Sequence, residues 1–421
     1  MFAPSVIAGR DGTSRATHDR GAVGVCTAHP SALRVRSLTA LTQTGPDTNW
    51  SSWSAGRRVV EVSRWIALVI VLGSILTACS GEPRREPASG QTSETSEQNP
   101  GEGEHSLAAV AAATRERVSV YDGIATGVIT LIRVGEQTEV ITAGRAQRRP
   151  RVAMAPDMRF LIASITKTMT AALVMQLVDE GRLALDDPAR RWVPELRSLP
   201  PITIEDLLSH RSGLPDTTQA DVDQVGTDTR QLVERAVAHG LEFAPDSRGN
   251  YSNLGYGVLQ LLLERIRRRP FSAQLERLIF TPAGMDSSTL FGRPDARGHV
   301  DGNEVTGQHL IRLLPASGSV VSTARDIDAF YQALWGGRLV ATDRVADMAT
   351  PRGDVVQFTE YGLGMAVRKV SCGEAVGSSG RGEGFSIDAY TLAETDRSTV
   401  VMVNDHLSDA LPSIVETALC G

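Results

Sequence analysis

The pattern of apolar and polar residues separates an irregular N-terminal part of the chain from a regular remainder. Residues 1–56 show no period that fits a helix or a strand. Residues 80–105 are polar, rich in Pro, Gly, Ser and Glu, and unable to bury enough apolar surface to fold. From Ser106 onward the pattern is regular. We therefore expect one ordered domain over 106–421, an unstructured leader over 1–58 and a disordered tether over 80–105.

Helical and extended periods alternate at the start of this domain. Ser106 is a candidate N-cap for an Ala-rich helix that runs to about residue 121. Two β-rich runs then flank a Gly135-Glu136 turn and predict a hairpin. Apolar residues return at helical spacing over 165–179, so Ser164 should lie at the N-terminus of a second helix.

The same reading extends to the C-terminal half. Val258, Leu261, Leu262 and Ile266 mark an amphipathic helix after a turn at Gly249-Asn250. T-x-x-D patterns predict further helix caps, and three segments have strand composition before a final short helix. A Gly-rich segment, Gly377 to Gly384, should join two of these strands. The caps are Thr203–Asp206 and Thr323–Asp326; the strands are MAVRKV, GFSIDAYTLAE and STVVMVND; the helix is LSDALPSIVETALC.

An apolar run precedes the tether and predicts export. Residues 65–78 are almost wholly apolar, follow three arginines, and are somewhat short for a membrane-spanning helix, which needs about 20 residues. Leu76-Thr77-Ala78-Cys79 resembles the lipobox of bacterial lipoproteins. We expect a lipoprotein signal peptide over 59–79, acylation of Cys79, and anchoring to the outer face of the cell membrane. The alternative is an uncleaved anchor with an incidental cysteine.

The position of this run puts the start of the chain in question. A signal peptide should begin near the first residue, whereas this one begins near residue 59. Either the natural start lies at or near Val59, Val60 or Val62, or residues 1–58 form a long cytoplasmic extension.

Composition narrows the classes of function. The chain has 41% hydrophobic residues and a net charge of −6, and its first 79 residues carry eight arginines against four acids. The remainder is therefore acidic and has no basic stripe, which argues against nucleic-acid binding. The eight histidines are scattered without metal-ligand spacing. We expect no metal, no cofactor and a monomer.

Lysine usage singles out one short motif. The chain has two lysines, and one of them, Lys167, lies three residues after Ser164. That spacing puts both side chains on one face of the predicted helix. A serine hydroxyl is a weak nucleophile without a base, and a lysine whose pKa is lowered by burial can be that base. The alternative for an isolated S-x-x-K is an ordinary exposed pair.

Tyr251-Ser252-Asn253 lies where the chain enters the helix marked by Val258. A phenol and an amide at such a place can point together into a cleft, although Asn253 could also be a simple cap and Tyr251 a packing residue.

S-x-x-K, Y-S-N and a Gly-bounded strand segment, in this order, resemble the serine β-lactamase/penicillin-binding family. Class C β-lactamases, D-alanyl-D-alanine carboxypeptidases and their esterase relatives are similar also in supporting stretches. The resemblance implies a mixed α/β fold, in which an antiparallel sheet with flanking helices, about 106–165 and 316–421, carries an inserted all-helical lobe, about 166–315. The stretches are LLSHRSGLPD (207–216), GVLQLLLERI, TPAGMDSSTL, ASGSVVSTARDIDAF (316–330) and YGLGMAV.

The resemblance also assigns roles. Ser164 would be the acylated nucleophile, and Lys167 and Tyr251 would share proton transfer, with Tyr251 as the base or the relay. Asn253 would hydrogen-bond the substrate amide and Lys167. The backbone N–H groups of Ser164 and Arg381 would form the oxyanion hole.

The third motif departs from the family. Lys-Thr-Gly or His-Thr/Ser-Gly is usual, whereas Ser378-Ser379-Gly380 stands here as part of the predicted substrate site. The missing cation usually helps to hold a substrate carboxylate. Arg381 could compensate in part if its side chain turned into the cleft.

Two functions follow from these motifs. The first is a serine hydrolase acting on esters or on D-amino-acid peptide or amide bonds, with a small ester or a peptidoglycan-type peptide as substrate. The second is a degenerate relative that binds penicillin or a cell-wall ligand without turnover. No G-x-S-x-G elbow of a Ser-His-Asp hydrolase occurs.

Cysteine usage predicts one disulfide. Cys26 lies in the leader and Cys79 is expected to carry lipid, which leaves Cys372 and Cys420 in an oxidising compartment. We expect these two to pair and to tie down the last helix.

Overall fold

The structure, a computed structural model, describes residues 106–421 except 125, 306–312, 356–357, 359, 383, 394 and 407–409. The predicted leader, signal peptide with Cys79, and tether lie outside the described residues. The strands are β1 (Gly127–Val134), β2 (Gln137–Gln147), β3 (Val152–Ala153), β4 (Phe160–Leu161), β5 (Thr289–Leu290), β6 (His299–Val300), β7 (Asn303–Glu304), β8 (Val320–Ser322), β9 (Glu360–Tyr361), β10 (Ala366–Val370), β11 (Gly373–Gly382), β12 (Phe385–Leu392) and β13 (Arg397–Val403).

Eight of these strands form one antiparallel sheet in the described part of the chain, in the order β3-β2-β1-β13-β12-β11-β10-β9. The first and last long strands are neighbours, since β1 pairs with β13 from Val128↔Val403 to Val134↔Arg397. Both ends of the domain therefore build the sheet, and the chain between them supplies most of the helices. The hairpin predicted at Gly135 is confirmed by the pairing of β1 with β2.

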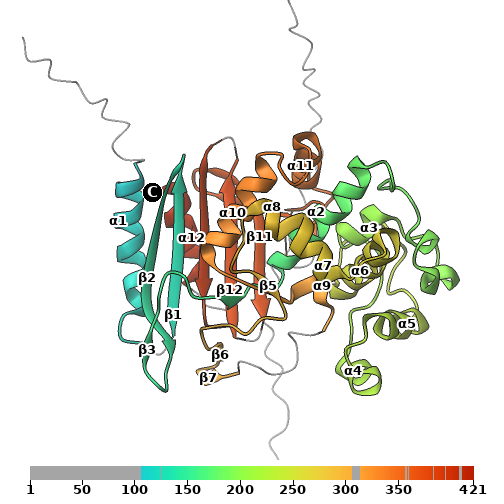
Figure 1. Ribbon diagram of the computed structural model, residues 1–421, viewed down its shortest axis with the longest axis horizontal. Coiled ribbons are helices and arrows are strands. Elements are labelled where there is room, and N and C mark those ends of the chain that lie inside the picture. Colours follow the sequence, from blue (N-terminus) through green and yellow to red (C-terminus); the bar gives the residue numbers. More distant parts are fainter. Residues whose placement is uncertain are drawn as a thin grey trace, which may run out of the picture. The chain divides into compact units, whose positions relative to one another are not determined.

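The helices cover both faces of the sheet (Figure 1). They are α1 (Leu107–Val118), α2 (Ile165–Asp179), α3 (Ile204–Leu208), α4 (Gln219–Val225), α5 (Thr229–His239), α6 (Asn253–Arg267), α7 (Phe271–Leu275), α8 (Thr281–Ala283), α9 (Pro315–Gly318), α10 (Ala324–Trp335), α11 (Thr342–Ala349) and α12 (Leu411–Cys420). An antiparallel sheet flanked by helices confirms the predicted fold class; the predicted lobe boundaries stay a prediction.

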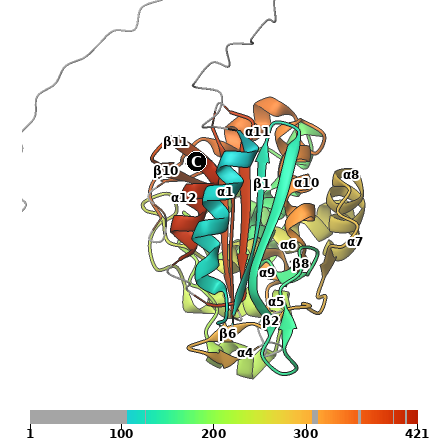
Figure 2. The ribbon, with the colours of Figure 1, turned by 90° about the vertical axis from the view of Figure 1, so that its left-hand side faces the viewer.

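Apolar side chains of β1 point alternately to the two faces of the sheet, so helices cover both faces. Val128 and Ile132 point into the smaller core, which they share with α1 and α12. Ile129 and Leu131 point into the larger core with α2 and the inserted helices. Figure 2 shows α1 and α12 lying side by side across one face of the sheet.

Helix boundaries follow the predicted caps. The Ser106 side chain accepts a hydrogen bond from the N–H of Ala109 at the start of α1. Thr203 and Asp206 form a complete capping box, and Thr323 accepts from the N–H of Asp326. The helix predicted over 165–179 is α2 with the same bounds.

The composition of the Gly-rich segment predicted a connection between strands, which is wrong for residues 377–382, whereas the family resemblance gave a strand segment here. Residues 373–382 form β11, an inner strand paired with both β10 and β12. Gly, Ser and Arg do not favour strands, so the local pattern gave no signal. Burial against α2 and the two neighbouring strands overrides that propensity.

The last helix is fixed covalently. Cys372, in the β10–β11 turn, forms the expected disulfide with Cys420 at the end of α12, with a Cα–Cα distance of 5.4 Å. The backbone N–H of Ser371 also donates to the Glu416 carboxylate at 2.7 Å.

The described residues contain neither a membrane-spanning helix nor a cluster of metal-ligating side chains. Among them, no helix is long and apolar enough to cross a membrane. No three His, Cys, Asp or Glu side chains in the same part of the chain are grouped so that they could hold a metal ion.

Candidate active site

Ser164 lies at the N-terminus of α2, immediately after an unusual backbone turn. Ala163 has a φ of +45°, in the left-handed region that costs an alanine conformational energy. The turn ends the short strand β4 and starts the helix. Ser164 makes no capping hydrogen bond with its side chain, so its hydroxyl is not committed to the helix backbone.

Lys167 follows one turn later and is completely buried. Its Nζ lies 3.1 Å from the Ser164 Oγ, 2.8 Å from the Asn253 Oδ1 and 2.8 Å from the backbone carbonyl oxygen of Ser317. Burial lowers the pKa of Lys167 to about 7, against an opposing effect of the Asp216 charge. An amine whose pKa is lowered in this way can lose its proton near neutral pH. The alternative of an exposed Ser/Lys pair is excluded.

Tyr251 approaches the same serine from the other side. Its hydroxyl lies 2.8 Å from the Ser164 Oγ and donates a hydrogen bond to it. Burial raises the pKa of Tyr251 far above its usual range, so the phenol keeps its proton at neutral pH. Ser164 therefore has an amine that can accept a proton and a phenol that can donate one within hydrogen-bond distance.

Asn253 is the first residue of α6, and its neighbour Ser252 is the cap, accepting from the N–H of Gly255. The Asn253 amide has a defined orientation because its Nδ2 donates to the Asp216 Oδ2 at 2.8 Å. Its Oδ1 is thereby turned toward Lys167. The other Asp216 oxygen accepts from the N–H of Leu254 at 3.2 Å.

Sequence reasoning missed Asp216, His210 and Ser317 as individual residues of this site. Asp216 and His210 belong to LLSHRSGLPD and Ser317 to ASGSVVSTARDIDAF, two stretches noted only as similar to the family. The signal was present in those stretches. The similarity of these stretches did not assign roles to the three residues, because their roles depend on contacts between segments that are distant in the chain.

The His210 imidazole packs against the ring of Tyr251. The two rings are 4.2 Å apart between centroids, and Tyr361 and Tyr256 lie at 4.8 and 5.3 Å from the same imidazole. The His210 Nδ1 accepts from the backbone N–H of Ser252 at 3.2 Å. Burial first, and the nearby Lys167 charge second, hold the pKa of His210 well below its usual range. The imidazole is therefore neutral, with its proton on Nε2.

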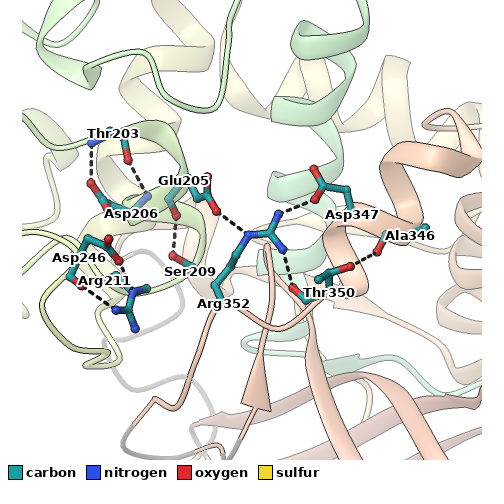
Figure 3. A network of polar contacts seen from close by, with 10 residues as sticks. All are labelled: Thr203, Glu205, Asp206, Ser209, Arg211, Asp246, Ala346, Asp347, Thr350 and Arg352. Carbon is teal, nitrogen blue, oxygen red and sulfur yellow. Dashed lines mark hydrogen bonds and ion pairs between the residues drawn. The ribbon is translucent and has the colours of Figure 1, made fainter. Parts of the chain in front are cut away.

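A network of charged side chains holds the segment that carries His210 (Figure 3). Arg352 joins Glu205 of α3 to Asp347 of α11 through ion pairs. Arg211, next to His210, binds the Asp246 carboxylate at 2.7 Å. Arg352 thus links α3 to α11, and Arg211 links the loop after α3 to Asp246, so these contacts hold the part of the chain on either side of His210.

The edge of β11 comes very close to Ser164 at Gly380. A Cβ added there would lie 2.2 Å from the carbonyl oxygen of Ile162 and 3.3 Å from the Ser164 nitrogen. Only glycine fits this approach. Arg381 and Ser164, whose backbone N–H groups are the predicted oxyanion hole, both line the cleft over Ser164.

The side chains of β11 alternate between the two faces of the sheet. Gly380 faces Ser164, and Ser378, two residues earlier, is buried on the same face. Ser379 lies on the opposite face, where its hydroxyl lies 2.9 Å from that of Tyr390. Ser378 and Gly380 therefore share the face of the sheet that packs toward Ser164, although neither is among the residues that line the cleft, and the Ser379 side chain is directed away from that face.

Arg381 also points its guanidinium away from the nucleophile. Its Nη1 donates to the Asp388 Oδ1 and to the carbonyl oxygen of Ile387, both at 2.8 Å. Compensation for the missing cation by this side chain, considered from the sequence, is contradicted because the buried Asp388 carboxylate holds it.

The cleft over Ser164 has a volume of about 230 Å³. The residues that line it come from the two ends of the domain and from the inserted helices. They are Leu161, Ala163, Ser164, Asp216, Thr217, Asn253, Leu313, Leu314, Ser317, Gly318, Arg381 and Gly382.

The family model for Beta-lactamase matches residues 100–413, which include every residue of this cleft. The chain belongs to the beta-lactamase family. Curated relatives include Esterase EstB from Burkholderia gladioli, which is 34% identical over 38% of this chain and 45% of its own length. The D-alanyl-D-alanine-carboxypeptidase/endopeptidase AmpH from Escherichia coli is 28% identical over 59% of this chain and 67% of its own length.

Solved structures of the family agree with the fold. D-amino acid amidase from Ochrobactrum anthropi is 25% identical, with a TM-score of 0.68, covering 74% of this chain and 98% of the amidase. D-stereospecific amidohydrolase from Streptomyces is 28% identical, with a TM-score of 0.64 and the same two coverages. Among the curated relatives, the chain spans 45% of the esterase and 62% of the putative penicillin-binding protein PbpX of Bacillus subtilis.

Proposed function

We propose that this protein is a serine hydrolase that forms an acyl-enzyme on Ser164 and acts on esters or on D-amino-acid peptide or amide bonds. One observation carries the proposal: the Ser164 Oγ lies 3.1 Å from a fully buried Lys167 amine and 2.8 Å from the Tyr251 hydroxyl. Relatives named as an esterase, a carboxypeptidase and an amidase support this range of substrates.

The geometry suggests how protons move during acylation. Neutral Lys167 accepts the hydroxyl proton as the Ser164 Oγ attacks the substrate carbonyl carbon. The backbone N–H groups of Ser164 and Arg381 stabilise the resulting oxyanion. As the tetrahedral intermediate collapses, Tyr251 donates its proton to the leaving group and regains one from protonated Lys167. Water then attacks the ester carbonyl carbon, loses a proton to the same pair of groups, and releases Ser164.

The experiment is to incubate the full-length protein with activated esters and, separately, with labelled penicillin. Intact-mass measurement should show one acyl group per chain, and peptide mapping should place it on Ser164. Ser164→Ala is the control and should give no adduct. Turnover of the ester without any adduct that maps to Ser164, and undiminished turnover by Ser164→Ala, would reject the proposal.

One observation favours a second function. Ser378 provides no cation where the family usually has one, which agrees with a protein that binds a penicillin or cell-wall ligand without turnover. A stable adduct on Ser164, with no product released over hours, would favour this binding protein over the hydrolase.

We further propose that the protein is exported and anchored by lipid on Cys79. The support is the apolar run before Cys79 and the resemblance of Leu76–Cys79 to a lipobox. Labelled palmitate should enter the wild-type protein in cells but not Cys79→Ala. Equal labelling of both proteins would reject the anchor.

A further inference from the structure

The cleft over Ser164 contains a carboxylate, Asp216, which can interact with a charged group of the substrate. Asp216 lines the cleft together with Ser164 and Asn253, and its side chain is exposed to solvent. A carboxylate that faces the space beside a nucleophile acts on whatever charge the substrate carries.

Asp216 has room for a further partner. One oxygen accepts from the Asn253 Nδ2 at 2.8 Å, and the other accepts from the N–H groups of Leu254 at 3.2 Å and Thr217 at 3.0 Å. A carboxylate offers about four acceptor positions, so one remains, on the oxygen that Asn253 contacts. Within the described ranges, no arginine, lysine or histidine forms an ion pair with Asp216.

The cationic residues closest to the nucleophile do not offset this charge toward the substrate. Lys167 is completely buried, and all three of its hydrogen bonds go to protein oxygens. The Arg381 guanidinium is bound to Asp388 on the other face of the sheet. Ser378, at the position where relatives have Lys or His, is neutral. In the described part of the site, the charge presented to a substrate is therefore negative.

We propose that Asp216 binds a positively charged amino group on the acyl part of the substrate, so that the preferred substrates are amino-acid esters or amides with a free α-ammonium group. The inference rests on the proposed function and specifies its substrate class. An α-ammonium lies one carbon away from the carbonyl that Ser164 attacks. Asn253 hydrogen-bonds both Lys167 and Asp216, and Ser164, Asn253 and Asp216 line the same cleft, so a substrate held at Ser164 can place its ammonium toward this carboxylate.

Asp216 also orients Asn253, so its replacement should slow every substrate. Absolute activity therefore cannot distinguish the two roles. The ratio of the kcat/KM values of two substrates can distinguish them. A purely positioning role lowers both kcat/KM values equally, whereas ammonium binding changes their ratio.

The test compares phenyl esters of D-alanine and of isobutyric acid, in which a methyl group replaces the ammonium. The ratio of their kcat/KM values is measured in the full-length wild type and in Asp216→Asn. We expect the ratio to fall by about tenfold in the variant, since a charge-assisted bond is roughly twice as strong as a neutral one. Asp223→Asn, a carboxylate on α4 that does not line the cleft, should leave the ratio unchanged.

A second measurement needs no variant. The wild-type preference for the alanine ester should disappear as the pH rises through the pKa of the substrate ammonium, about 8. The N-acetyl and N-succinyl derivatives of the same ester should be poorer substrates than the free amine at pH 7. The L-alanine ester, run in parallel, reports the stereochemical preference separately.

The outcomes separate the two proposals. If no ester acylates Ser164, the proposed hydrolase itself is wrong. If Ser164 is acylated but wild type and Asp216→Asn give the same ratio, or wild type prefers the succinyl ester, ammonium binding by Asp216 is overturned and the hydrolase stands. If Asp216→Asn does not fold, the pH dependence of the wild-type ratio decides.

Discussion

The Tyr251 hydroxyl lies 2.8 Å from the Ser164 Oγ, although 87 residues separate them in the chain. Ser164 opens α2, and Tyr251 ends the loop that enters α6. Burial raises the pKa of this phenol, whereas burial lowers that of Lys167 to about 7. In the proposed mechanism Lys167 is therefore the base at neutral pH, and Tyr251 is the proton donor.

Removal of either end of the Ser164–Lys167 contact should stop the reaction. Ser164→Ala should abolish turnover, and Lys167→Ala should lower kcat at least about a hundredfold, the usual size of a general-base contribution. Lys167→Arg should be nearly as damaging, because a guanidinium does not lose its proton at neutral pH. Steady-state hydrolysis of a neutral ester measures this, and an active Lys167→Arg would exclude lysine as the base.

The pH dependence of acylation should report the Lys167 amine. Its pKa of about 7 lies below the ordinary lysine value of 10.5, so the neutral base is lost as the pH falls below about 7. We expect kcat/KM for a neutral ester to rise with pH and to level off above about 8. A midpoint near 10, or a rate that falls between pH 6 and 8, would contradict this assignment.

The same pKa predicts a change in stability with pH. Between about pH 7 and 10 the unfolded chain holds a proton on Lys167 that the folded protein has lost, so the free energy of unfolding should rise with pH in that window. Lys167→Met, which cannot titrate there, should show a smaller rise. Denaturant unfolding of both proteins at pH 7 and 9 gives the comparison, and identical slopes would disprove the shift.

His210 should act through Tyr251 as a positioning residue. His210→Ala removes the ring under the phenol and the acceptor for the Ser252 N–H. We expect kcat to fall by about tenfold to a hundredfold with little change in KM, since small misplacements of catalytic groups have effects of this size. His210→Asn is the matched control: asparagine tolerates the φ of +60° and can accept the same bond, so it should retain more activity. Equal losses in both variants would point to a general folding defect.

The Cys372–Cys420 disulfide should contribute stability and not activity. The bond closes a loop between residues 48 apart and joins the β10–β11 turn to the end of α12, and neither cysteine lines the cleft. The double variant Cys372→Ser/Cys420→Ser should lose about 2–4 kcal/mol in the free energy of unfolding. Its kcat on a neutral ester should match the wild type. Two free thiols in the denatured, unreduced protein would rule the bond out.

Ser378 should limit the use of anionic substrates. A neutral hydroxyl gives a substrate carboxylate no charge-assisted bond, so we expect neutral esters to be turned over better than β-lactams or peptides that end in D-Ala. Ser378→His should narrow that difference. Arg381→Ala should leave it unchanged and instead lower stability, because Asp388 would keep only Arg368 as an ionic partner. A loss of carboxylate recognition in Arg381→Ala would show that the guanidinium reaches the cleft.

The sequence by itself determined most of the elements and the identity of the central motifs. Helical spacing over 165–179 predicted α2 with its observed bounds, and caps such as Ser106 and the Thr203–Asp206 box marked further helix starts, because those signals act within one or two turns. The order of the sequence motifs identified the candidate catalytic residues Ser164, Lys167 and Tyr251.

Tertiary structure alone decided what surrounds those motifs. Contacts between different segments of the chain decide the burial of Lys167, the direction of the Arg381 side chain and the orientation of Asn253. Examples are the contact of Asn253 with Asp216 and that of Arg381 with Asp388 across β11 and β12. Strand β11 escaped prediction from composition because its Gly and Ser residues are held extended by their neighbours and by close packing on α2, not by their own preference. Local propensities act over a few residues, whereas pKa values, side-chain direction and a strand of glycines are set by what the fold packs against them.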